Sequence, residues 1–190
     1  WEERLFDSID ILAPAVQPMT FKTLYIGGGT PSVLPPDQLD RVLDRISQAF
    51  DWHPRAARHF EFDPSIMNDA KLAVLTKHRF THFSFGIQTL QAEINAQHNR
   101  GKQSIDIVAR RFTEFQAQGI EQISCDFLAG LAGTTPEDIL SEVEQVVSRF
   151  KPAWVDVFMI TPTSEYVDGH FNGSYEKFFE HLRPFQERVP

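Results

Sequence analysis

Cysteine is nearly absent from this chain. The 190 residues contain one, Cys125, so they form by themselves neither an internal disulfide framework nor a metal site with several cysteine ligands. Because Cys125 lies inside an apolar stretch, we expect a small buried hydrophobic side chain there and not a nucleophile.

Long apolar runs and an excess of positive charge are also missing. No run approaches the roughly 18 residues of a membrane span, and no basic segment followed by an apolar one opens the chain. We therefore expect a cytoplasmic location and no membrane partner. The formal net charge is −8 and the pI is about 5.3. This argues against nucleic acid as a partner, because binding its backbone needs a concentrated Lys/Arg surface.

The sequence does contain a regular alternation of short apolar runs and amphipathic segments. This alternation is typical of an α/β fold with parallel strands, and a chain 42% hydrophobic is long enough to form a core. The expected strands are 21–26, 59–62, 82–87, 122–128 and 154–160. The expected helices are 1–13, 35–50, 66–78, 105–118, 136–150 and 171–188.

Three consecutive glycines, Gly27, Gly28 and Gly29, follow the first expected strand and precede Thr30. Glycine in an ordered element costs about 0.5–1 kcal/mol relative to alanine, so we expect a positive φ or a close backbone approach here. The spacing is neither Gly-x-Gly-x-x-Gly nor a P-loop. Two interpretations remain open at this point: a plain tight turn, or backbone exposed to a small polar ligand.

Polar side chains stand at the ends of the later strands, where parallel α/β folds bind ligands. Glu61 alternates with Phe60 and Phe62, so its side chain lies on the opposite strand face, either toward a barrel interior or toward solvent. Its place among the polar strand ends favours the interior. Gln88 ends the next strand. Asp126 lies in a strand suited to burial, so its carboxylate needs a donor or a ligand.

Other charged residues have plainer interpretations. Arg100 follows a helix and is either a solvated cap or a clamp for a carboxylate. Asp37, Asp40, Glu142 and Glu144 are expected on exposed helix faces. The seven histidines show no metal-ligand spacing, which favours surface positions or ordinary packing.

The order of these motifs resembles the radical S-adenosylmethionine enzymes. It is most similar to the branch that holds oxygen-independent coproporphyrinogen III oxidase, haem chaperones, anaerobic haem-degrading enzymes and related C-methyltransferases. The stretches that carry the resemblance are 25–32 (YIGGGTPS), 61–64 (EFDP), 83–88 (FSFGIQ), 99–100 (NR) and 123–131 (ISCDFLAGL).

The resemblance implies a partial parallel (β/α)6 TIM-like barrel, the radical S-adenosylmethionine core, over residues 1–163. Residues 164–190 are then a helical segment, either the end of the core or the start of a substrate domain. In this family a Cys-x-x-x-Cys-x-x-Cys loop binds a 4Fe-4S cluster. These residues lack that loop, so the first strand and the cluster cysteines are expected upstream of Trp1, and no metal ligand is assigned here.

The resemblance also implies a cofactor site, although it assigns no catalytic residue. Arg100 is the expected partner of the S-adenosylmethionine carboxylate, and Gln88 and Glu61 are expected near its ribose or methionyl group. The residues implied to bind S-adenosylmethionine are Gly27, Gly28, Gly29, Thr30, Glu61, Gln88, Arg100 and Asp126.

The implied function is reductive cleavage of S-adenosylmethionine to act on a tetrapyrrole, either decarboxylating coproporphyrinogen or methylating and degrading haem. The implied partners are this substrate and a reductant such as flavodoxin. Two alternatives stay open: a haem-binding chaperone of the same fold, and a radical C-methyltransferase acting on another substrate. Without the cluster cysteines, these residues alone are expected to be inactive.

Overall fold

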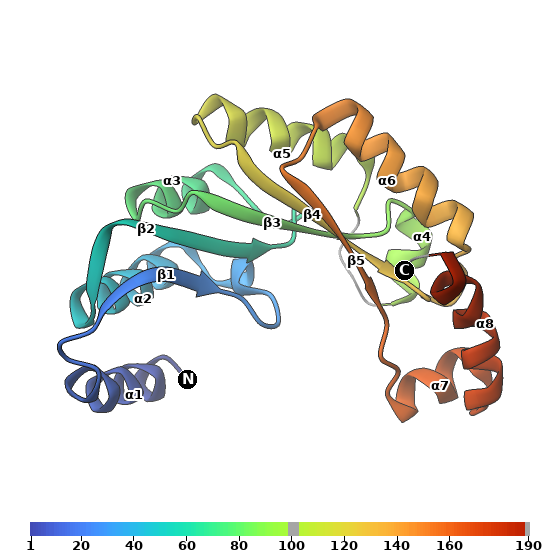
Figure 1. The fold of residues 1–190 in the computed structure, drawn as a ribbon, viewed down its shortest axis with the longest axis horizontal. Coiled ribbons are helices and arrows are strands. Elements are labelled where there is room, and N and C mark those ends of the chain that lie inside the picture. The colour runs from blue at the N-terminus through green and yellow to red at the C-terminus, as the bar shows by residue number, and fades with distance from the viewer. Residues whose placement is uncertain (99–102, 189–190) are drawn as a thin grey trace. The chain divides into compact units, whose positions relative to one another are not determined.

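The computed structural model describes residues 1–98 and 103–188, which form parallel strands joined by helices (Figure 1). The strands are β1 (Thr20–Ile26), β2 (Asp51–Phe62), β3 (His82–Gln88), β4 (Gln122–Ala129) and β5 (Trp154–Met159). They belong to one sheet in the order β1-β2-β3-β4-β5. The chain divides into two compact units, Trp1–Ser84 and Phe85–Pro190.

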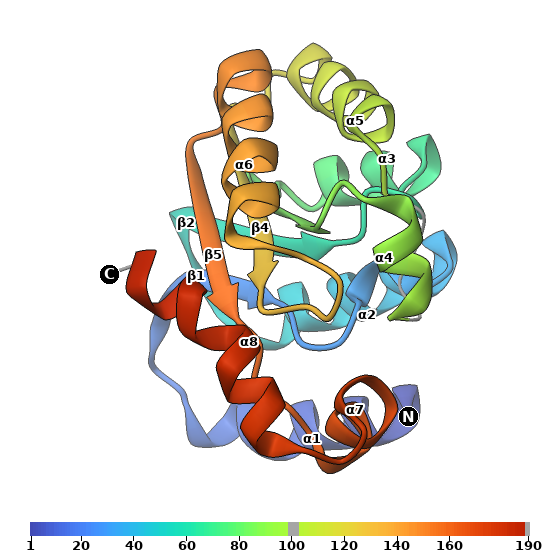
Figure 2. The same cartoon turned by 90° about the vertical axis from the view of Figure 1, so that its right-hand side faces the viewer.

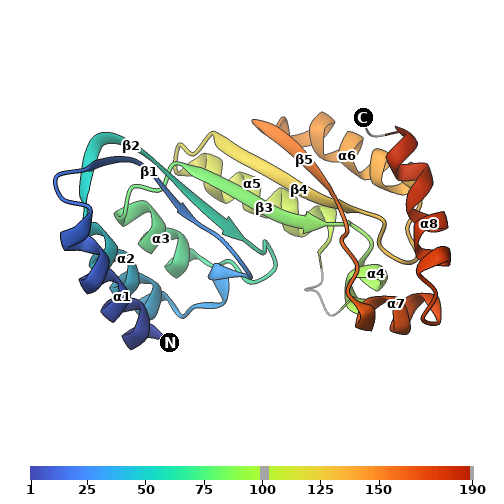
Figure 3. The ribbon, with the colours of Figure 1, turned by 60° about the horizontal axis from the view of Figure 1, so that its bottom comes forward.

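The first unit contains α1 (Glu2–Ala15), the short 3-10 helix η1 (Pro31–Val33), α2 (Pro36–Ala49) and α3 (Asp69–Lys77). Helix α2 packs against both α1 and α3 (Figure 3). The alternate residues Phe60 and Phe62 of β2 are buried, and Phe60 makes an edge-to-face contact with Phe80. This alternation gives β2 one apolar face for the core and one polar face.

Strand β2 is longer than the sequence predicted. Its pairing with β1 is parallel but irregular: β1 advances from Phe21 to Thr23 while β2 advances from Trp52 to Ala57. Pro54 lies in the extra residues of β2, and proline has no N–H to donate to a neighbouring strand. The prediction began this strand at residue 59 and did not include the proline-containing stretch before it.

The second unit contains α4 (Ala92–Gln97), α5 (Ile105–Ala117), α6 (Pro136–Phe150), α7 (Ser164–Phe171) and α8 (Tyr175–Arg188). Helices α5 and α6 pack against each other (Figure 2). The rings of Phe112 and Phe150 stack with their centroids 5.0 Å apart. Strands β4 and β5 are parallel. Cys125 in β4 is fully buried, as expected, and burial raises the pKa of its thiol.

The C-terminal region differs from the single helix expected over 171–188. Asn172 and Gly173 have φ values of 54° and 71°, which end α7 before α8 begins. Helix α8 packs closely on the loop after β4, because a Cβ at Gly130 would lie 2.7 Å from the side chain of Leu182. Among the described residues, no helix combines the length and apolar character needed to cross a bilayer.

Candidate functional site

The loop after β1 shows why this chain contains three consecutive glycines. Gly28 and Gly29 have φ values of 86° and 64°, in the left-handed region that side chains disfavour. A Cβ at either position would meet no atom within 4 Å, so the loop faces open space there. The predicted positive φ is therefore confirmed.

Gly27 is required for a different reason, the close approach of two side chains. A Cβ at Gly27 would lie 2.6 Å from Cδ of Glu61 and 2.6 Å from a ring carbon of Tyr25. The Tyr25 hydroxyl donates a hydrogen bond to Oε1 of Glu61, and the Gly28 amide donates to Oε2 at 3.1 Å. Both carboxylate oxygens are thus held by the glycine loop and the strand before it.

Glu61 lies where the alternation of β2 placed it, on the opposite face from its buried neighbours Phe60 and Phe62. Its side chain is half-buried. A carboxylate with two fixed donors keeps further lone pairs, and these can accept hydrogen bonds from a ligand hydroxyl or ammonium group. Glu61 is therefore an anchored acceptor beside exposed backbone.

An aromatic row runs along the same side of the first unit. The Tyr25 ring stacks on His59 at 5.6 Å, and His59 stacks on His82 at 4.3 Å. Burial lowers the pKa of both histidines, and for His59 the neighbouring His82 adds to the effect. Neutral imidazoles give this row a face suited to planar groups. Sequence reasoning missed it, although Tyr25, His59 and His82 occupy equivalent alternate positions on three strands.

The loops after β1 and β2 are tied together by a buried lysine. The ammonium of Lys71, from α3, donates to the carbonyl oxygens of Ser32 at 2.6 Å and Ile66 at 3.1 Å. The amide of Asp63 donates to the Ser32 hydroxyl at 3.1 Å. Burial lowers the pKa of Lys71. These bonds fix the segment that follows Thr30, and no motif in the sequence indicated them.

In the second unit, Gln88 ends β3 in a strained conformation. Its φ is 69°, and the amide of Thr89 donates to the carbonyl of Ile87 at 2.9 Å across it. A three-residue turn with positive φ at a residue other than glycine is rare and strained. Such outliers persist only where the surrounding structure holds them, and they gather at functional sites.

The restraint on this turn is Glu142 of α6, which the sequence placed on an exposed helix face. That prediction was wrong: Glu142 is 5% exposed. Its carboxylate accepts hydrogen bonds from the Thr89 hydroxyl at 2.8 Å, the Leu90 amide at 2.7 Å and the Gln91 side chain at 3.1 Å. A charged residue inside a helix is buried here because the loop after β3 supplies its donors.

Asp126 of β4 is half-buried, on the opposite strand face from the buried Cys125 and Phe127. In the parallel register its partner is Asp156 of β5. Two carboxylates at paired positions repel one another, so this pair favours donors or a cation nearby. Asp156 was not among the expected site residues, although it alternates with Val155 and Val157 as Asp126 does with its neighbours.

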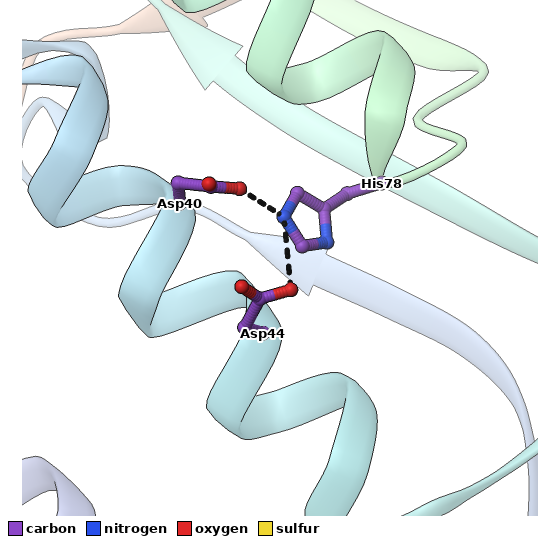
Figure 4. Close-up of side chains that lie close together, drawn as sticks. All are labelled: Asp40, Asp44 and His78. Carbon is purple, nitrogen blue, oxygen red and sulfur yellow. Dashed lines mark hydrogen bonds and ion pairs between the residues drawn. The ribbon is translucent and has the colours of Figure 1, made fainter.

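Asp40 departs from its expected role as a solvated charge. With Asp44 of the same helix it faces His78, which is 5% exposed (Figure 4). The His78 Nε2 atom lies 2.7 Å from Asp40 Oδ1 and 3.7 Å from Asp44 Oδ1. One nitrogen or oxygen atom from each of these three side chains lies within 4.8 Å of the other two, close enough to hold a metal ion. The spacing of the histidines in the sequence did not indicate this group. The Lys77 ammonium, however, already contacts both oxygens of Asp40, so the cluster is an ion-pair network joining α2 and α3.

The expected site residues therefore fall into two groups. In the first unit the structure joins Gly27 and Gly28 to Glu61, with Gly29 and Thr30 following directly. In the second unit Gln88 is the last residue of β3, whereas Asp126 is the fifth of the eight residues of β4. Arg100 lies outside the described residues.

The glycine loop fits a polar organic ligand, because it combines exposed backbone at Gly28 and Gly29 with the anchored carboxylate of Glu61. The chain does not fit an iron–sulfur cluster. Its one cysteine is fully buried in β4, and the raised pKa of that thiol disfavours the thiolate that binds iron.

Comparison with known proteins agrees with this architecture. The model of the radical SAM superfamily matches residues 2–146. The chain therefore belongs to the radical SAM superfamily, whose members use S-adenosylmethionine and a 4Fe-4S cluster. Among solved structures, coproporphyrinogen III oxidase (HemN) from Escherichia coli, a radical SAM enzyme, aligns with a TM-score of 0.82 and 22% identity. The alignment covers 98% of this chain and 43% of that one, which confirms the predicted α/β fold, a partial parallel barrel that has five parallel strands here.

Curated relatives carry two different names. The heme chaperone HemW of Lactococcus lactis subsp. lactis (strain IL1403) is 34% identical over 135 residues, 69% of this chain and 34% of the relative. Oxygen-independent coproporphyrinogen III oxidase of Paracoccus denitrificans (strain Pd 1222) is 26% identical over 149 residues, 78% of this chain and 33% of the relative. The chain thus spans about a third of the length of these relatives.

Proposed function

We propose that this chain is the S-adenosylmethionine-binding part of a radical enzyme that acts on a tetrapyrrole. The observation that carries the proposal is the carboxylate of Glu61, held by Tyr25 and by the Gly28 amide beside exposed glycine backbone. The tetrapyrrole substrate is suggested by the names of the relatives, which concern haem and coproporphyrinogen.

The residues of the first unit would hold the cofactor by hydrogen bonds. Glu61 would accept from ribose hydroxyls or from the methionyl ammonium, because its oxygens are fixed and half-buried. Gly28 and Gly29 would let the cofactor approach the backbone without meeting a side chain. When bound, S-adenosylmethionine supplies the radical chemistry, and the protein supplies position and exclusion of water.

The second unit would contribute Gln88 and Asp126, with Arg100 as the partner of the cofactor carboxylate. The strained turn at Gln88 supports this assignment, because strain is retained where a side chain must be aimed. The cluster ligands are not among these 190 residues, so the intact protein needs three cysteines from elsewhere. A reductant such as flavodoxin is the proposed electron donor.

A second candidate function is a haem-binding chaperone, favoured by the similarity to the Lactococcus lactis relative. In that case S-adenosylmethionine binding would accompany haem binding without turnover. The two functions share a fold, and a fold alone does not decide an activity.

The experiment that tests the cofactor site is calorimetric titration of S-adenosylmethionine into the full-length protein, purified anaerobically and reconstituted with iron and sulfide. Glu61→Ala is expected to weaken binding about tenfold or more, since it removes hydrogen bonds to a charged group. Glu3→Ala, an exposed acidic residue of α1, is the matched control. Equal affinity in wild type and Glu61→Ala would refute the assignment.

Turnover separates the two candidate functions. The reconstituted protein is mixed with a reductant and either coproporphyrinogen III or haem, and 5′-deoxyadenosine is measured. Its accumulation with a tetrapyrrole supports the enzyme. Tight haem binding without accumulation overturns the enzyme proposal in favour of the chaperone.

A further inference from the structure

A cavity lined by several basic residues lies in the first unit, away from the glycine loop. Its volume is about 480 Å³, within the range of small-molecule sites. It is formed by the irregular first half of β2 and the turn between α3 and β3. The lining residues are Trp52, His53, Pro54, Arg55, Ala56, Ala57, Arg58, Arg79, Thr81 and His82.

The lining carries three arginines and no carboxylate. In the described part of the chain, neither Arg55, Arg58 nor Arg79 forms an ion pair. Arg58 donates instead to uncharged oxygens, the carbonyl of His78 at 2.7 Å and the hydroxyl of Ser47 at 3.4 Å. Arg55 and Arg79 are exposed and Arg58 is half-buried, so three guanidinium groups without a salt-bridge partner in the described residues line one cavity of a protein whose net charge is −8. Positive charge gathered in this way attracts anionic ligands.

Two physical effects act against this gathering of positive charge. Burial lowers the pKa of Arg58, and the neighbouring charge of Arg79 lowers it further. Arg58 also lies over the ring of Trp52, with its guanidinium carbon 5.5 Å from the ring centroid. The Arg58 guanidinium is therefore fixed by Trp52, the His78 carbonyl and the Ser47 hydroxyl, and no acid in the described residues neutralises it.

Arg79 occupies a position that favours glycine. It follows the end of α3 with a φ of 58°. The amides of Arg79 and Phe80 donate to the carbonyls of Thr76 at 2.9 Å and Leu75 at 3.0 Å, the bonding pattern of a Schellman cap. Glycine would adopt this conformation with less strain, so arginine is not the residue that the backbone conformation favours at position 79.

We propose that this cavity binds a small molecule bearing phosphate groups. Guanidinium groups match phosphate oxygens with paired N–H donors, and three of them suit a ligand with more than one phosphate. Trp52 and the His82 ring add surface for an organic portion. The site lies toward the amino-terminal side of β2, whereas Glu61 lies at its carboxyl end, so it is distinct from the proposed cofactor site.

The test is calorimetric titration of inorganic pyrophosphate into the full-length protein, with S-adenosylmethionine affinity measured on the same samples. Wild type is expected to bind one pyrophosphate. Arg55→Gln and Arg79→Gln are each expected to weaken this binding about tenfold or more, with S-adenosylmethionine affinity unchanged. Arg4→Gln, which removes the same charge from an exposed position of α1, is the control and should bind as wild type.

Arg79→Gly separates binding from folding. It keeps the left-handed backbone and removes the guanidinium, so the melting temperature should rise while pyrophosphate binding falls. Absence of pyrophosphate binding by wild type would overturn the proposal. So would equal weakening in Arg4→Gln and Arg55→Gln, or full affinity in Arg79→Gly.

Discussion

Replacing Glu142 by alanine removes the carboxylate that holds the loop after β3. In the structure this side chain is 5% exposed and accepts hydrogen bonds from Thr89 at 2.8 Å and Leu90 at 2.7 Å. Alanine leaves the buried hydroxyl of Thr89 and the half-buried amide of Leu90 without this acceptor. We expect a large loss of stability, together with a change in the turn at Gln88.

The magnitude follows from the two shortest bonds. A hydrogen bond to a charged group contributes about 1.5–3 kcal/mol, so losing both costs about 3–6 kcal/mol. Domains are stable by about 5–15 kcal/mol in total, so the alanine variant is expected to fold marginally. Glu142→Gln keeps one acceptor oxygen for either the Thr89 hydroxyl or the Leu90 amide. Its NH₂ group then faces the other of these two donors. Its expected cost is about 2 kcal/mol.

Urea unfolding followed by circular dichroism measures both variants. Glu144→Ala, an exposed acid two residues along α6, is the matched control and should change stability by less than about 0.5 kcal/mol. S-adenosylmethionine affinity of Glu142→Gln is expected to fall, because Thr89 adjoins Gln88. If Glu142→Ala matched Glu144→Ala in its unfolding midpoint, the inferred role of this carboxylate would be refuted.

Three further predictions concern other parts of the chain. Gly27→Ala places a Cβ 2.6 Å from Glu61 and should cost about 1–3 kcal/mol by urea unfolding, whereas Gly169→Ala, with open space around it, should not destabilise. Hydrogen bonds from Lys77 lower the pKa of Asp40, so its contribution is present above the unfolded pKa and lost as pH falls through the folded pKa. Asp40→Asn should therefore cost about 0.5–1 kcal/mol at pH 7, and a cost that did not shrink below about pH 4 would contradict the ion pairing. Cys125, fully buried with a raised pKa, should react with a thiol reagent only after unfolding, and labelling of the native protein would contradict its burial.

Much of the fold was predictable because each element carries its own pattern. The capping box of α6 is an example: Thr135 and Asp138 exchange hydrogen bonds at the helix start, next to a proline that also favours a helix N-terminus. The end of α5 at Gly119, with a φ of 75°, was predictable in the same way. These signals are local, so neighbouring residues suffice to interpret them.

The predictions that were wrong concern residues whose environment comes from far along the chain. Glu142 resembles any solvated helix acid until the loop at Thr89, 53 residues away, supplies donors. Asp40 also has the sequence pattern of a solvated helix acid, but in the structure it contacts His78 and Lys77 at the end of α3. The first half of β2 was not predicted: Pro54 weakens a strand locally, whereas pairing with β1, a distant segment, extends it.

The sequence by itself determined the class of this protein, the order of its five strands, and the positions of Glu61 and Gln88 at or near strand ends. Apolar periodicity, glycine and proline encode these features over a few residues each. Only the tertiary structure decided that Gly27 makes room for Glu61 and that three arginines share a cavity without a carboxylate. The physical reason is that burial and charge balance depend on contacts between side chains that are distant in the sequence. A pattern of neighbouring residues does not predict such contacts.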